Sequence, residues 1–557
     1  MTYYVENFER ILATVAERYA DLLTTRELAF GADLRALSVG ARRLYVRLVS
    51  RVGPYFRRDD LDYEEIPDKT SAITELAAAR FVDVAPAAEP AALLRHLLRC
   101  EIEALAADLG VAGGRGPKAR LIEALAGAHD PNALRAAILE RVPLLAPLRL
   151  EEVTLYRLLF FGNLRQDLSE LVLADIGVWR YESYELRRDL RRFPDRAAVD
   201  DALAVRSLQE RASACVEAGD GRAAWTVAAA VARRDPAWHP TSRAVADGIL
   251  LAIAHLLERA GALEQALELY AAAEAPPARE RCARLLARLC RERRAIALCR
   301  EIAASPRDES ERLFAARFEQ RLRRSLGQVP PARRRYRRAH RLVLCADGER
   351  AVESLALEHY AARGQHGFHA ENWLWLALYG LAFWDVIYAP VPGAFEHAYQ
   401  DGPLDLEEAA FRARRASAID QRLAEIEGAA WPAERLLAIW DAKCGIRNRL
   451  VPWATAVRSR LELALSRLDG RHLSTVLDRL TRDLGRYRRG LPDLFVVTPD
   501  APGFVLLEVK GPGDRLRPEQ VAWLDYLDAN GLPCTVLAVE WSTAASGMRF
   551  AAVESSE

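Results

Sequence analysis

Apolar residues recur at helical spacing through most of the first 345 positions, whereas strand-like runs are confined to the last part of the chain. The first domain that this pattern predicts covers residues 1–90. Residues 41–48 are amphipathic, and the segment 73–76 leads to the apolar pair Phe81 and Val82. Short helices followed by a short apolar segment favour a winged-helix-like module.

Residues 91–128 predict a helical hairpin. Leu94, Leu97, Ile102 and Leu105 fall on one helix face, and a glycine-rich turn then leads to a second helix that opens with residues 116–122 and has Pro117 at its start. The hairpin resembles the SAP module, a small DNA-binding unit. The resemblance implies that Lys118 and the amides of the helix start bind a DNA phosphate. An ordinary helical hairpin would explain the same residues without DNA.

The next two regions are also predicted to be helical. Residues 129–200 form a connector, and residues 201–345 form an almost unbroken series of helices in which Pro306 ends one unit. Alanine and glycine at close-packing positions are typical of TPR-like helical repeats. Such repeats bury a core between neighbours and leave an extended surface, which we expect to be open to a protein partner.

A basic run follows these repeats. Its positive charge could bind a DNA backbone. A solvated helix face, or a neighbouring acidic surface, would account for the run equally well. The candidate DNA-binding residues of the run are Arg333, Arg334, Arg335, Arg337 and Arg338.

Residues 346–557 predict an α/β domain. The segment 373–388 is apolar nearly all round, as in a buried helix, and residues of about 394–470 form a helical insertion. The predicted order is α-β-β-α-β, with a helix from residue 352, strands at 494–497 and 504–510, a helix at 518–527 and a strand at 534–539.

Composition narrows the classes of function. Among 557 residues, 51% are apolar and the formal net charge is zero, so DNA binding must come from local basic patches. No apolar stretch is long enough for a membrane span, and the N-terminus lacks the pattern of a signal peptide. The eight cysteines are scattered, which favours reduced thiols in a bacterial cytoplasm and argues against a zinc site.

The chemistry is concentrated in the hairpin of the last domain. Alternation puts Glu508 and Lys510 on one face of their strand, and Asp493 starts the partner strand. Two adjacent carboxylates repel each other unless a cation lies between them. Oxygen ligands suit Mg²⁺ or Mn²⁺, and the backbone carbonyl of Val509 is a further candidate ligand. Lys510 is one of only four lysines in the chain, and it would stabilise charge on a phosphate.

Glu371 is the candidate third carboxylate. We expect it in the first turn of the apolar helix, where an unpaired charge is costly. The alternative is that it complements the helix dipole. Gln520, in the helix after the hairpin, completes the set of candidate catalytic residues.

These motifs carry a resemblance to known nucleases. Pro-Asp followed by Glu-x-Lys is similar to the PD-(D/E)XK superfamily, and residues 489–494, 507–514 and Gln520 resemble its VRR-NUC (virus-type replication-repair nuclease) domain. Residues 367–371 and the helix after them resemble the extra glutamate-bearing element of the Fanconi-associated nuclease family. The order of SAP-like hairpin, helical repeats and nuclease extends the resemblance over nearly the whole chain.

The resemblance implies a restriction-endonuclease-like fold for the last domain. It implies metal-dependent cleavage of branched DNA, especially 5′ flaps, 5′-to-3′ trimming and a role in interstrand cross-link repair. Asp493, Glu508, Lys510 and Glu371 match the catalytic positions, and Gln520 matches a supporting glutamine. A Holliday-junction resolvase with the same core, or a DNA-binding scaffold with a decayed nuclease, are the alternatives.

Overall fold

The computed structural model describes residues 3–51, 53–111, 117–164, 166, 179–234, 238–307, 309–328, 339–345, 350–408, 410–428, 433–499 and 502–542. The chain divides into two compact units. The first unit comprises Met1–Arg180, Leu186–Arg196 and Glu396–Tyr399, and the second comprises Tyr181–Glu185, Ala197–Phe395 and Gln400–Glu557. Among the described residues, no helix combines the length and the apolarity needed to cross a bilayer.

The first unit is mainly helical and has a small antiparallel sheet in the order β1-β3-β2. Phe81, from the predicted apolar pair, packs edge-on against Tyr45, with ring centroids 4.9 Å apart. Phe30 and Tyr156 extend this aromatic core. Its elements are α1 (Tyr3–Tyr19), α2 (Thr25–Ala36), α3 (Val39–Val49), β1 (Phe56–Arg57), η1 (Arg58–Asp60), α4 (Lys69–Ala78), β2 (Val82–Asp83), β3 (Leu144–Pro147), α9 (Leu150–Phe161) and η2 (Arg188–Leu190).

The predicted hairpin of residues 91–128 contains two helices in this unit. Ile102 and Leu105 of α6 (Arg99–Asp108) share one buried core with Leu121 and Leu125 of α7 (Lys118–Ala128). Two further helices, α5 (Pro90–Leu94) and α8 (Pro131–Arg141), also contribute to this core, together with Leu97, Val142 and Leu144. Residues 112–116 of the glycine-rich turn lie outside the described residues.

Residues 396–399 belong to the first unit although their chain neighbours belong to the second. Glu396 is fully buried. Its Oε2 accepts a hydrogen bond from the Tyr19 hydroxyl at 2.6 Å and lies 3.2 Å from Arg18 Nη1, and its Oε1 accepts one from the Arg192 amide at 2.6 Å. Burial raises the pKa of this carboxyl to about 7, against the opposing effect of Arg18. The buried guanidinium and carboxylate therefore depend on each other.

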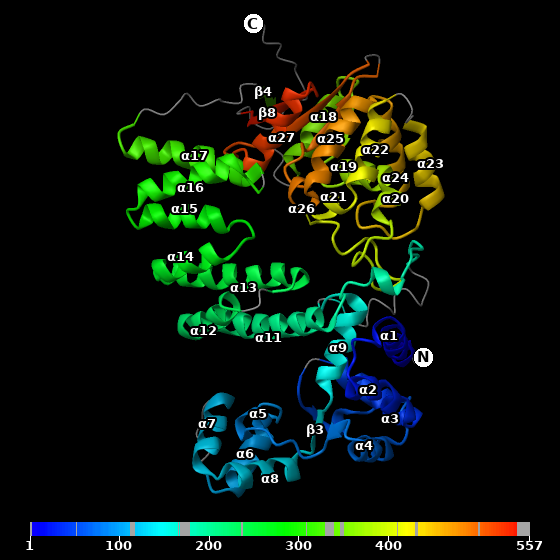
Figure 1. The fold of residues 1–557 in the computed structure, drawn as a ribbon, viewed down its shortest axis with the longest axis vertical. Coiled ribbons are helices and arrows are strands. Elements are labelled where there is room, and N and C mark those ends of the chain that lie inside the picture. The colour runs from blue at the N-terminus through cyan, green and yellow to red at the C-terminus, as the bar shows by residue number, and fades with distance from the viewer. Residues whose placement is uncertain are drawn as a thin grey trace. The chain divides into compact units, whose positions relative to one another are not determined.

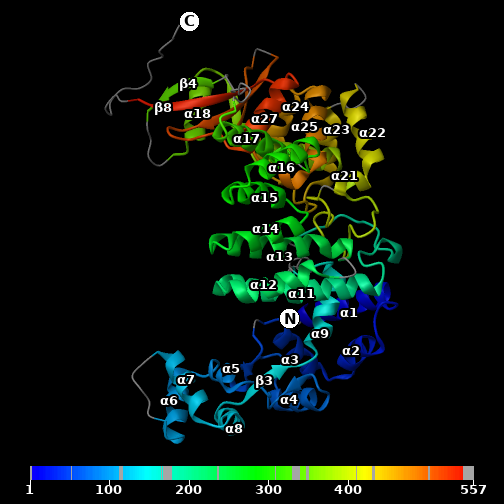
Figure 2. The ribbon, with the colours of Figure 1, turned by 60° about the vertical axis from the view of Figure 1, so that its left-hand side comes forward.

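Helices α11 to α17 follow one another as a stack, visible in both views (Figures 1 and 2). Successive helices share apolar cores, such as the one formed by Ile253, Leu269 and Leu285. These helices span residues 196–325, whereas residues 339–344, at the end of the range 201–345 predicted to be helical, form a strand of the C-terminal sheet. The members of the stack are α11 (Arg196–Ala218), α12 (Gly221–Ala232), α13 (Pro240–Arg259), α14 (Leu263–Ala272), α15 (Ala278–Arg288), α16 (Glu292–Ala304) and α17 (Glu309–Ser325).

A five-stranded sheet in the order β4-β8-β7-β6-β5 forms the centre of the C-terminal part of the second unit. Strands β4 and β7 run parallel to β8, while β5, β6 and β7 pair antiparallel. One face packs through Leu507 and Val509 on Leu355 of the helix Val352–Ala361. The strands are β4 (Ala339–Leu344), β5 (His366–His369), β6 (Leu494–Val497), β7 (Phe504–Lys510) and β8 (Cys534–Trp541).

Further helices surround this sheet. They are α18 (Val352–Ala361), α19 (Leu374–Ala382), α20 (Trp384–Ile387), α21 (Ala410–Arg414), α22 (Ala416–Glu427), α23 (Ala433–Lys443), α24 (Thr455–Leu465), α25 (Gly470–Arg482), α26 (Leu484–Tyr487) and α27 (Pro518–Ala529). Helix α19 is buried throughout its length, as its apolar sequence predicts.

Two strands of the sheet were not predicted from the sequence. Strand β4 lies at one edge and exposes most of its residues, and its sequence Ala-His-Arg-Leu-Val-Leu directly follows the basic run, which hid its short apolar segment. Strand β5 reads His-Gly-Phe-His and is held by close packing instead. A Cβ at Gly367 would lie 2.8 Å from Leu357 Cδ2 and 3.0 Å from Val496 Cγ2, so only glycine lets α18 approach the sheet this closely.

Candidate active site

The Gly-x-Pro-Asp sequence leads to the site, and at its glycine the backbone packs closely against the backbone of α27. Gly490 has a φ of +83°, and a Cβ there would lie 2.7 Å from the backbone carbon of Glu519 and 2.8 Å from the amide nitrogen of Gln520. The position therefore requires glycine for both its conformation and its space. The turn holds the chain against the start of α27, three residues before Asp493 begins its contacts with the sheet.

Asp493 and Glu508 face each other across the hairpin. The register of β6 and β7 puts Leu494 opposite Leu507, and Asp493 and Glu508 are the next pair along the same ladder. Residues opposite each other point to the same face of a sheet. Asp493 Oδ2 also accepts a hydrogen bond of 2.7 Å from the Val509 amide, so its carboxylate is fixed against the Glu-x-Lys strand.

The backbone of Asp493 links this pair to Glu371. The Asp493 carbonyl accepts hydrogen bonds from the amides of Ala370 at 2.8 Å and Glu371 at 3.3 Å. These bonds continue the ladder between β5 and β6 by one step beyond the strands. As a result, all three acidic residues lie at the same end of the sheet.

Burial makes both central carboxyls unusually basic. Asp493 is 8% exposed and Glu508 is fully buried. Desolvation raises the pKa of Asp493 to about 6, with a further increase from the negative charge of Glu371. Desolvation and the charge of Asp493 raise the pKa of Glu508 to about 8, against the opposing effect of Lys510. The site is therefore short of positive charge.

Lys510 supplies part of that charge. Its Nζ lies 2.7 Å from Glu508 Oε1. Neither oxygen of Glu508, however, has a hydrogen-bond partner of suitable geometry within the described residues. A fully buried carboxylate normally has such partners. Its two oxygens thus remain available to a cation in addition to the lysine.

Comparisons with known proteins show which family this chain is similar to. The family model "FAN1, HTH domain" matches residues 2–83, and the model "VRR-NUC domain" matches residues 428–541. A Fanconi-associated nuclease 1 homolog from Pseudomonas aeruginosa is 35% identical over 548 residues, which cover 97% of this chain and 96% of that protein. The chain belongs to the Fanconi-associated nuclease family.

More distant relatives and solved structures extend the match. Human Fanconi-associated nuclease 1 is 28% identical over 648 residues, which cover 96% of this chain and 62% of the human protein. The crystal structure of paFAN1 bound to 2nt 5′flap DNA with gap matches this structure with a TM-score of 0.86 and 33% sequence identity. The match covers 98% of this chain and 99% of that chain. A second structure, with a 1nt 5′flap, matches with a TM-score of 0.85.

Family membership confirms the predicted fold class, a mainly helical N-terminal part followed by a C-terminal α/β nuclease domain. It also confirms that this chain is a structure-selective, DNA-hydrolysing enzyme. As a PD-(D/E)XK-type VRR-NUC nuclease, the enzyme depends on a divalent metal ion.

The side chains at this site are suited to hold a divalent metal ion. Within the described residues, no group of three or more His, Cys, Asp or Glu side chains is already arranged as a metal cage. The fit comes from the buried oxygens of Glu508, which lack hydrogen-bond partners, and from the raised pKa of Asp493. Hard oxygen donors of this kind suit Mg²⁺ or Mn²⁺ better than softer metals. None of the eight cysteines, all of which lie among the described residues, forms a disulfide.

Glu371 lies slightly outside the position expected from the sequence. It is in a turn that precedes α19, which begins at Leu374, and not in the first turn of that helix. The positive φ of Asn372 (+63°) ends the strand conformation and delays the helix. Its negative charge nevertheless raises the pKa of both Asp493 and Glu508, so Glu371 lies near the two carboxyls.

Sequence reasoning missed one acidic residue of this cluster. Glu353 lies in the first turn of α18, and its charge also raises the pKa of Asp493. The neighbouring Val352 packs against Gly511, directly after Lys510, which brings the start of α18 to the site. A Glu in the first turn of a helix is common for dipole reasons alone, so the sequence held no distinctive signal for it.

The remaining candidates have other surroundings. Gln520 is buried, and its Oε1 accepts a hydrogen bond from the Arg517 amide at 2.9 Å, which caps α27. Lys118 is the first residue of α7, and its Nζ donates to the Arg95 carbonyl at 2.8 Å. The arginine run at 333–338 lies outside the described residues. Lys118 belongs to the first unit, whereas the carboxylates belong to the second.

Proposed function

We propose that this enzyme is a 5′-flap endonuclease and 5′-to-3′ exonuclease that hydrolyses phosphodiester bonds in interstrand cross-link repair. The observation that carries the proposal is the pair of buried carboxylates, Asp493 and Glu508, with Lys510 against Glu508. Matches to relatives crystallised on 5′-flap DNA support the choice of substrate. We place its work in the bacterial cytoplasm, on the DNA of the nucleoid.

Three carboxylates and one carbonyl would hold the metal ion, either Mg²⁺ or Mn²⁺. They are those of Asp493, Glu508, Glu371 and the backbone of Val509. When bound, such an ion polarises a phosphate oxygen and lowers the pKa of a bound water. Since Asp493 and Glu508 must lose their protons to act as ligands, their raised pKa values make metal affinity increase with pH.

Lys510 acts on the substrate, whereas Gln520 supports the site from α27. Lys510 is partly buried next to Glu508, where a fixed ammonium stabilises the charge that develops on the scissile phosphate. Gln520 caps the helix that Gly490 touches, so it positions the Asp493 segment. Both roles require a fixed distance between the β6–β7 hairpin and the start of α27.

The decisive experiment incubates the protein with a 5′-flap duplex and Mn²⁺ or Mg²⁺. A blunt duplex and a four-way junction serve as comparison substrates. Cutting close to the flap junction is expected from the wild type and is expected to be lost in Glu508→Ala and in the isosteric Glu508→Gln. Binding of the flap by both variants would show that they remain folded.

Two outcomes would overturn the proposal. Paired symmetric cuts in the four-way junction, with no preference for flaps, would favour a Holliday-junction resolvase. Flap binding without metal-dependent cutting by the wild type would favour a non-catalytic repair scaffold.

A further inference from the structure

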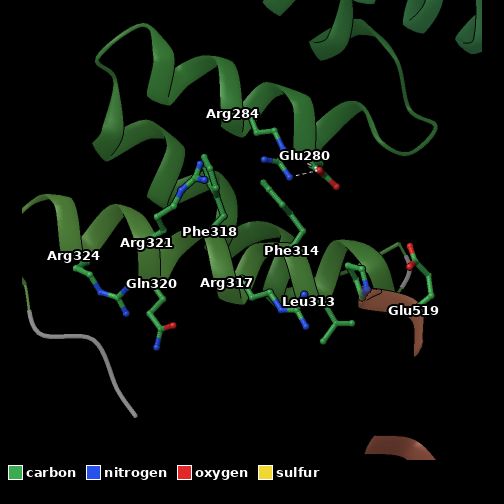
Figure 3. Close-up of a pocket in the computed structure, with 11 residues that line it drawn as sticks. Glu280, Arg284, Leu313, Phe314, Arg317, Phe318, Gln320, Arg321, Arg324 and Glu519 are labelled. Carbon is green, nitrogen blue, oxygen red and sulfur yellow. Dashed lines mark hydrogen bonds and ion pairs between the residues drawn. The ribbon is translucent and has the colours of Figure 1, made fainter. Parts of the chain in front are cut away.

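A cavity of about 460 Å³ opens in the second unit, away from the carboxylates. It lies between α15, α17 and the start of α27 (Figure 3). Arg284 reaches from α15 towards Phe314 and Phe318 of α17, while Arg317 and Arg324 lie along α17 itself (Figure 3). Pro518 and Glu519 close one side. The cavity therefore borders the helix that carries Gln520.

The α17 wall of this cavity carries positive charge that its surroundings do not neutralise. Arg317, Arg321 and Arg324 are spaced by four and three residues, so they share one helix face. Within the described part of the chain, no ion pair involves any of these three side chains. By contrast, Arg323 on the opposite face pairs with Glu319 at 2.7 Å. Like charges on one face destabilise a helix unless an anion binds there.

Aromatic rings hold two of the guanidinium groups in place. Phe314 and Phe318 stack with centroids 4.9 Å apart. The Arg284 Cζ lies 4.8 Å from the Phe314 centroid, and the Arg321 Cζ lies 4.5 Å from the Phe318 centroid. Stacking of a guanidinium on a ring leaves its in-plane N–H groups free to bind a phosphate in bidentate geometry. Among the described residues, Arg284 is the one arginine of the four that has an ion-pair partner, Glu280 of its own helix at 2.8 Å.

We propose that this cavity binds an unpaired strand of the branched DNA substrate, through a phosphodiester on Arg317, Arg321 and Arg324 and a base on Phe314. This inference rests on the proposed function. Phe314 is only partly buried, whereas Phe318 is in the core, so part of the Phe314 ring remains accessible to a ligand beside its contacts with Phe318 and Arg284. An unpaired strand offers both a phosphate and an unstacked base, which is the combination that such sites bind. A duplex keeps its bases stacked on one another and offers only its backbone.

The test measures binding by fluorescence anisotropy in EDTA, so that no cutting occurs. The probes are a duplex with a long unpaired 5′ flap, the same duplex without the flap, and the flap strand alone. The variants are the double substitution Arg317→Ala/Arg321→Ala, Arg324→Ala and Phe314→Leu. Arg323→Ala is the matched control, because it removes an arginine from the other face of the same helix. Thermal unfolding checks that each variant is folded.

The double variant is expected to bind the flapped duplex and the single strand about tenfold more weakly, with the salt slope reduced by about 0.7, as loss of one single-strand phosphate contact predicts. Phe314→Leu should weaken binding about fivefold and leave the salt slope unchanged, because stacking is not ionic. Binding of the flapless duplex, and every measurement on Arg323→Ala, should stay within twofold of the wild type.

Unchanged flap affinity in the double variant and in Arg324→Ala would overturn the inference. Equal losses on the flapped and flapless duplexes would also overturn it, in favour of a duplex-backbone site. Parallel cleavage assays with Mn²⁺ separate this failure from failure of the proposed function. Wild-type protein that cuts flaps while the variants bind normally leaves the nuclease intact, whereas wild-type protein that neither cuts nor prefers flaps removes the basis of both.

Discussion

The carboxylate of Asp493 accepts a hydrogen bond from the amide of Val509, the residue between Glu508 and Lys510. One contact thus fixes the aspartate of the first motif to the backbone of the second. Because the bond uses the main chain, it orients Asp493 whether or not its neighbours are charged. The hairpin therefore builds the geometry of the site before any metal ion enters.

Because Asp493 is held by the Val509 amide, a substitution can remove its charge without changing its position. Asp493→Asn can keep the hydrogen bond to Val509 through its amide oxygen but loses the negative charge. We expect metal-dependent cleavage to fall by about 10²-fold or more, with the melting temperature unchanged or raised, since a buried charge is removed. Asp493→Ala should lose the same activity and also lose stability. Cleavage within threefold of the wild type by the asparagine variant would show that another acidic residue does this work.

The raised pKa of Glu508 makes metal-free stability depend on pH. Its folded pKa of about 8 is above its ordinary value of 4.5, so the folded state binds the proton more tightly than the unfolded state. Its contribution to stability is complete below about pH 4.5 and is lost as the pH rises through about 8.

Denaturant unfolding in EDTA checks this sign. The wild type should lose on the order of 2–4 kcal/mol relative to Glu508→Gln between these pH values. Addition of Mn²⁺ should stabilise the wild type at high pH but not the glutamine variant, because only the carboxylate binds the ion. Parallel pH profiles of the two proteins without metal would show that Glu508 titrates normally.

Lys118 offers a test of the SAP-like hairpin. Its ammonium already donates to the Arg95 carbonyl, yet two of its three donors remain. We expect Lys118→Glu to weaken DNA binding, and Lys118→Met to reduce the slope of log affinity against log salt by about 1. Lys69→Met is the matched control, because Lys69 is also the first residue of a helix. An unchanged slope in Lys118→Met would assign the lysine to the hairpin alone.

Alanine substitutions at three glycines distinguish the cost of steric crowding from the cost of backbone strain. Gly490→Ala should destabilise the protein by about 3 kcal/mol or more, since it adds a clash with the backbone of α27 to a positive φ. Gly513→Ala, with a φ of +88° in open space, should cost only about 1 kcal/mol, and Gly503→Ala, with neither feature, should be neutral. Equal melting temperatures for the alanine variants at 490 and 513 would contradict the close approach at α27.

The central motif was predictable because it follows local rules. Alternation along β7 puts Glu508 and Lys510 on one face, and the turn sets the register that brings Asp493 opposite. Strand β5 and Glu353 were not predictable, because their positions depend on packing between distant segments. Gly367, for example, matters only once Leu357 of α18 lies against it. Glu371 was expected in the first turn of α19 but lies in the turn before that helix. The sequence has no clear signal for the positive φ of Asn372 that delays the helix.

Residues 396–399 also have a consequence for how the protein is made. The first unit emerges from the ribosome before the second, and N-terminal domains generally fold first during synthesis. Here Glu396, which binds Arg18 and Tyr19 in the interior of that unit, is translated long after residue 196. The unit that is synthesised first therefore cannot be completed first, and a fragment that stops at residue 196 would never acquire this carboxylate.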